Sequence, residues 1–117
     1  MNQKEIQQLV EEVERKEAAD FEDVNHYIFL HPELGLQEYL SAKYLVDFME
    51  RKGFAVTAPY ADFETAFRAE YGTKGPLFAF LAEYDALPGY GKNKENGHAC
   101  GHNWIASTAA GAAVVLA

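Results

Sequence analysis

Apolar residues recur at the spacing of one helix face in the first thirty residues. The series comprises Ile6, Leu9, Val10, Val13, Phe21, Val24 and Ile28. This period predicts one or two amphipathic helices over residues 3–30. The residue before a proline avoids the α region, so we expect Pro32 to end the helical stretch.

A second helix is predicted from about Gln37 to Lys52. Its apolar face carries Leu45, Val46 and Met49. Gly53 follows directly, and glycine is the residue that most often ends a helix in the left-handed conformation.

The pattern then changes to that of strands. Three strands are expected, at Phe54–Thr57, Thr65–Tyr71 and Leu77–Leu81. The third is nearly all apolar, which favours a central position in a sheet. A glycine-rich loop covers residues 86–101, and a helix of small residues begins at about Asn103. Helices that flank a small mixed sheet give an α/β fold class, in which ligands gather beyond the carboxyl ends of the strands.

Composition and charge narrow the classes of function. The 117 residues suffice for one small domain, and 49% of them are hydrophobic, enough to bury a core. The net charge of −8 disfavours nucleic acid or an anionic membrane as the main partner. Residues 1–40 hold ten acidic and three basic residues, which we interpret as a solvated helix face. A single cysteine, no apolar leader segment and no run of about 20 apolar residues predict a cytoplasmic protein.

Three potential metal ligands lie within five residues at the end of the glycine-rich loop. They are His98, Cys100 and His102. Imidazole and thiolate suit zinc, or manganese if carboxylates complete the coordination. Two other interpretations stay open on spacing alone. Cys100 is either a small buried residue or a nucleophile activated by a helix N-terminus.

Carboxylates precede that loop. Asp85 follows the third predicted strand, where it either caps a turn or orients a metal-bound histidine. Glu83 lies two residues earlier, so its side chain should point in the same direction. His31 lies in the turn that follows the first helical stretch, where a capping role is the default expectation.

Several short motifs occur in one order along the chain. They are His31–Gly35 with Glu38, Gly75–Pro76, Asp85–Pro88, His98–Asn103 and Gly111–Ala113. In this combination the chain resembles the N-terminal part of the N-acyl-amino-acid amidohydrolases, a metallopeptidase family, over about residues 20–117.

The resemblance implies a fold, a reaction and a site. The fold would be the N-terminal portion of a three-layer α/β/α zinc-peptidase-like catalytic domain. Cys100 and His102 would be metal ligands, Asp85 would be the catalytic-site residue that orients a ligand, and His98 would shape the loop. The family uses two divalent ions, zinc or manganese, to hydrolyse the amide bond of N-acyl amino acids or dipeptide-like substrates.

The resemblance also implies what this chain lacks. The general base, the other ligands and the dimerisation domain of the family come after these motifs. We therefore expect residues 1–117 to be an N-terminal fragment that is inactive alone, from an enzyme that forms a homodimer. The alternative is a self-contained small domain that binds a metal or a partner, or associates with itself, without catalysis.

Two motifs depart from the commonest family pattern. Glu83 and Tyr84 replace an Asp-Met pair, and Asn103 replaces an aspartate. Both variants resemble the branch of aminobenzoyl-glutamate hydrolase and the dipeptidase-like members.

Overall fold

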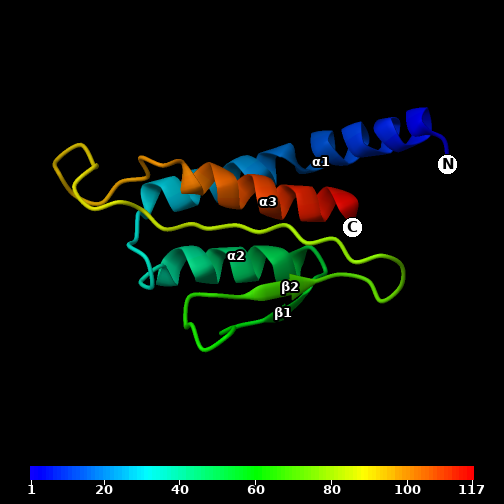
Figure 1. Ribbon diagram of the computed structural model, residues 1–117. Helices are drawn as coiled ribbons and strands as arrows, with labels where there is room; N and C mark the ends of the chain where they lie inside the picture. The colour runs from blue at the N-terminus through cyan, green and yellow to red at the C-terminus, as the bar shows by residue number, and fades with distance from the viewer.

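The computed structural model describes all of residues 1–117 as three helices and a two-stranded sheet (Figure 1). The elements are α1 (Gln3–Leu30), α2 (Tyr39–Arg51), β1 (Ala55–Thr57), β2 (Arg68–Glu70) and α3 (His102–Leu116). Helices α1 and α3 lie side by side, and the β1–β2 pair lies on the far side of α2 from them. The α/β class is therefore confirmed.

Helix α1 is one continuous element of 28 residues. It begins with a capping box, in which the Asn2 side chain accepts a bond from the Glu5 N–H and the Glu5 carboxylate accepts one from the Asn2 N–H. It ends at Leu30, two residues before Pro32, as predicted. The Nδ1 of His31 lies 2.7 Å from the Tyr27 carbonyl, so this histidine does close the helix end.

Helix α2 ends where the sequence predicted, because Gly53 adopts a φ of +90°. The chain then reverses into an antiparallel pair in which Val56 lies opposite Ala69. Both strands have only three residues and are shorter than expected. None of the helices is long and apolar enough to cross a membrane.

The core lies between α1, α2 and the inner face of α3. Its buried members are Val24, Ile28, Leu45, Phe48, Met49, Phe54 and Ala106. Phe48 and Ile28 are fully buried. At the edge of this core, the Lys52 ammonium lies 2.5 Å from carboxylate oxygens of Glu17 and Asp20, which fastens the end of α2 to α1.

The prediction of a third, central strand at Leu77–Leu81 is wrong for this structure. The segment runs across the molecule between α3 and α2 (Figure 1) but joins no sheet. Leu77 and Leu81 are more than four-fifths exposed. A strand that is apolar on both faces needs neighbours on both edges, and the two strands present pair only with each other. The sheet is accordingly antiparallel rather than mixed.

Replacing Phe48 by alanine should destabilise the fold by about 3–5 kcal/mol, because a fully buried ring leaves a cavity between α1 and α2. Urea unfolding followed by circular dichroism measures this change. Phe63→Ala is the matched control, since that ring is 51% exposed and its loss should cost less than about 0.5 kcal/mol. Equal effects of the two substitutions would contradict the assigned core.

Candidate functional site

The site is centred on a hydrogen bond between the extended segment and the start of α3. His102 is the first residue of α3, and its Nδ1 lies 2.7 Å from Oδ1 of Asp85. A carboxylate only accepts, so Nδ1 carries the proton and donates it. In the neutral ring the other nitrogen, Nε2, then carries the free lone pair.

Glu83 approaches the same imidazole from the other side. Its Oε1 lies 3.8 Å from Nε2 of His102, which is too far for a hydrogen bond. The two groups would form an ion pair when the imidazole is protonated. Glu83 and Asp85 both point toward His102, as their alternate spacing predicted. The ring therefore lies between two carboxylates, of which only Asp85 fixes its orientation.

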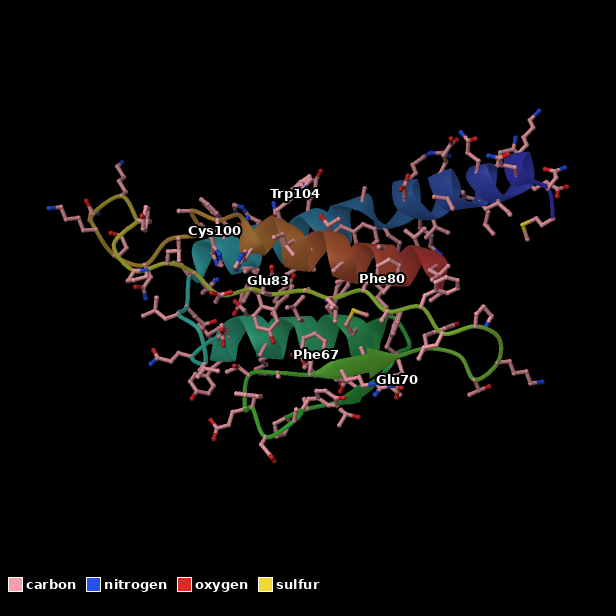
Figure 2. The ribbon with its side chains drawn as sticks, in the orientation of Figure 1. Phe67, Glu70, Phe80, Glu83, Cys100 and Trp104 are labelled. Atoms are coloured by element: carbon pink, nitrogen blue, oxygen red, sulfur yellow. The ribbon has the colours of Figure 1, made fainter.

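Cys100 lies just before α3, at the same end of the molecule as Glu83 (Figure 2). It is a free, exposed thiol. Gly101 separates it from His102 and adopts a left-handed φ of +76°, which a residue with a side chain rarely takes. The turn at Gly101 joins the exposed loop that ends with Cys100 to α3, which begins with His102.

The three candidate ligands do not converge on one point. No group of three or more His, Cys, Asp or Glu side chains is gathered closely enough to hold a metal ion. The ring nitrogens of His98 are buried and have no hydrogen-bond partner. That burial lowers the pKa of His98. Of the predicted site residues, the structure therefore brings together only Glu83, Asp85 and His102.

The glycine-rich loop is closed by its own backbone. Leu87 and Gly97 exchange two hydrogen bonds, of 3.0 and 2.9 Å. A Cβ at Gly97 would lie 2.8 Å from backbone atoms of Tyr90 and Gly91, so only glycine fits there. The loop thus returns the chain to α3 directly beside Asp85.

Tyr84 is a site residue that sequence reasoning missed. Its hydroxyl donates to the Thr65 carbonyl, and the Thr65 hydroxyl donates to Oε2 of Glu38 at 2.6 Å. Burial, followed by the nearby charges of Glu38 and Glu33, raises the pKa of Tyr84 to about 12. The sequence signals were the departure from the family pattern at Tyr84 and the presence of both glutamates in the His31–Gly35 motif with Glu38.

Asn103, one of the two departures from the family pattern, ties the site to α1. Its amide donates to the side-chain oxygen of Asn25 at 2.8 Å, and the residue is buried. The hydroxyl of Ser107, one turn further along α3, donates to the Phe21 carbonyl at 2.7 Å. The position of His102 is therefore set by α1 through α3.

Comparison with known proteins gives relatives that are named hydrolases. The chain is 32% identical to one subunit of the p-aminobenzoyl-glutamate hydrolase of Escherichia coli (strain K12), over 96% of this chain and 26% of that protein. It is 41% identical to the Xaa-Arg dipeptidase of Homo sapiens, over 74% of this chain and 22% of that protein. An uncharacterized hydrolase of Staphylococcus saprophyticus is 33% identical over 66% of this chain. No family model matches the sequence.

The chain is a relative of the amidohydrolase and peptidase family. This confirms the family inferred from the motifs. The chain spans about a quarter of the length of the curated amidohydrolase relatives that it matches. The names of the first two relatives match the branch of the family that the variants at Glu83 and Asn103 resemble.

Tyr84 should make stability depend on pH in the alkaline range. Its pKa is raised above the ordinary value of 10.0, so folding favours the neutral phenol. The resulting stabilisation is present below pH 10 and is lost as the pH rises toward about 12. We expect the difference in unfolding free energy between wild type and Tyr84→Phe to shrink over this range. Urea unfolding at successive pH values measures it.

Tyr90→Phe is the matched control, because Tyr90 is exposed in the glycine-rich loop and its substitution should change the unfolding free energy by less than about 0.5 kcal/mol. A difference for Tyr84→Phe that stays constant as the pH rises would contradict the burial of the Tyr84 hydroxyl.

Proposed function

We propose that this chain is the N-terminal portion of the catalytic domain of a metal-dependent amidohydrolase. The observation that carries the proposal is the bond between Asp85 and His102 Nδ1, which leaves Nε2 of His102 available two residues along the chain from the exposed thiol of Cys100. A carboxylate that holds one imidazole nitrogen while the other is free is the usual arrangement around a histidine ligand. The names of the hydrolase and dipeptidase relatives support the reaction class.

The donor atoms fit a divalent ion in part. Cys100 Sγ and His102 Nε2 would hold it, and a thiolate with an imidazole suits zinc, while added carboxylates would allow manganese. Such an ion polarises a scissile carbonyl and lowers the pKa of bound water. Asp85 holds the proton on Nδ1, so that the lone pair available to an ion is on Nε2.

The names of the same relatives support a substrate class that contains an amide bond. The proposed substrates are N-acyl amino acids or dipeptide-like molecules, cleaved at the amide bond. We propose that the remaining ligands, the general base, the rest of a three-layer α/β/α domain and a dimerisation domain belong to the three-quarters of the relatives that this chain does not span. The 117 residues would then bind an ion without turning over substrate.

Asp85→Asn should weaken zinc binding to the chain about 10- to 100-fold, because the amide no longer fixes the His102 ring as a carboxylate does. Isothermal titration with zinc chloride measures the affinity. Asp47→Asn is the matched control: Asp47 is an exposed carboxylate on α2 that pairs with Lys43. Equal affinities for wild type and Asp85→Asn would contradict the role assigned to Asp85.

The purified 117-residue chain should show no amide hydrolysis with zinc or manganese present. The physical reason is that two ligands would leave an ion under-coordinated. Release of amino acid from N-acyl amino acids and dipeptides is the measurement. Turnover that Cys100→Ala abolishes would contradict the proposed incompleteness of the site.

A further inference from the structure

The turn between α1 and α2 contacts the segment that carries Asp85. The backbone carbonyl of Glu33 accepts a hydrogen bond from the Ala86 N–H at 2.7 Å. It is the only backbone hydrogen bond made by residues 72–86. Ala86 is buried although the segment before it is exposed. The main chain next to Asp85 is therefore fixed at one point, and Glu33 supplies that point.

The side chain of Glu33 fixes the turn itself. Its two carboxylate oxygens accept the backbone N–H groups of Leu40 and Ser41, each at 2.9 Å. These groups are in the first turn of α2, where helical N–H donors have no partner within the helix. Glu38, at the N-cap position, makes no capping bond of its own. Glu33 thus caps α2 from seven residues away and holds its own carbonyl in place by doing so.

A second attachment acts on the residue before Asp85. Tyr84 is bound to the Thr65 carbonyl, and Thr65 is bound to Glu38, whose other oxygen accepts the Leu36 N–H at 3.0 Å. Both glutamates of the turn therefore hold a neighbour of Asp85, one on each side.

We propose that Glu33 is a positioning residue for the Asp85–His102 pair. Its carboxylate binds the start of α2, its carbonyl binds Ala86, and Asp85 is thereby held where it accepts the Nδ1 proton of His102. The proposal rests on the proposed function only in treating His102 as a metal ligand; the contacts themselves involve no metal. A group that orients a ligand has to be held within about 0.5 Å of its working position. The segment that carries Asp85 needs the bond from Ala86 to Glu33 for this, because its preceding residues make no other backbone hydrogen bond.

The test compares Glu33→Ala, Glu33→Gln and a control in the full chain. The readout is the tautomer of the His102 ring, from two-bond ¹H–¹⁵N correlation at a pH where the imidazole is neutral. Wild type should show the Nδ1–H form alone. Glu33→Ala should show a mixture of the two forms and about tenfold weaker zinc binding. Glu33→Gln should restore part of both, because the amide oxygen still accepts an N–H.

Glu5→Ala is the matched control. The Glu5 carboxylate also caps a helix by accepting a backbone N–H, but it does so at the start of α1. Unlike Glu33, it makes no hydrogen bond to the segment that carries Asp85. It should lower stability and leave the tautomer and the zinc affinity unchanged. If Glu33→Ala behaves in the same way, Glu33 is a helix cap alone and the proposal is overturned.

Two further outcomes keep the test decisive. Should Glu33→Ala not fold, Glu33→Gln is compared with wild type, and hydrogen exchange at the Ala86 amide is measured in wild type; fast exchange there would overturn the proposal. Absence of zinc binding by wild type, together with the tautomer change in Glu33→Ala, would refute the proposed metal function and leave the positioning role standing.

Discussion

The packing of α1 against α2, in which the Phe21 and Phe48 rings lie 6.3 Å apart between centroids, is the constraint on which the remaining structure depends. Helix α3 lies on α1, to which it is bound by Asn103 and Ser107. The Asp85 segment is held instead by the turn that begins α2. His102 is therefore positioned through α1, and Asp85 through the start of α2. We expect a change in the packing of α1 against α2 to alter the 2.7 Å separation at the site.

The charges near this contact reinforce it at one end. Lys52 lies over the ring of Phe48, 5.6 Å from its centroid, while it pairs with Glu17 and Asp20. These bonds raise the pKa of Lys52, first through Asp20 and then Glu17, and hydrogen bonding to Lys52 lowers the pKa of Asp20. Part of the acidity of α1 is thus neutralised where α2 ends, whereas the carboxylates of its first three turns face solvent.

The helices were predictable because their signal is local. The apolar period of α1, the proline after it and Gly53 after α2 each act within a few residues, and the helix ends fall close to the predicted positions. Strand formation is not local. Leu77–Leu81 has the composition of a central strand, but hydrogen bonding needs neighbours that these residues cannot specify. The sequence and the motif resemblance left Asp85 with a choice between capping a turn and orienting a ligand, without naming His102 as its partner. The roles of Glu33 and Tyr84 were missed, because the Glu33 carbonyl bonds the Ala86 N–H and the Tyr84 hydroxyl bonds the Thr65 carbonyl, in segments that are distant in sequence.

The unpaired run from Leu77 to Leu81 has a consequence for the handling of this polypeptide. It contains no charge and no proline, and its backbone donors and acceptors are open on both edges. Those are the attributes of a segment that seeds cross-β aggregation. Pro76 and Glu83 stand at its two ends and act as gatekeepers, since a ring without an N–H and a solvated carboxylate both interrupt strand stacking. We therefore expect these two flanking residues, together with the acidic first helix, to oppose aggregation of the chain.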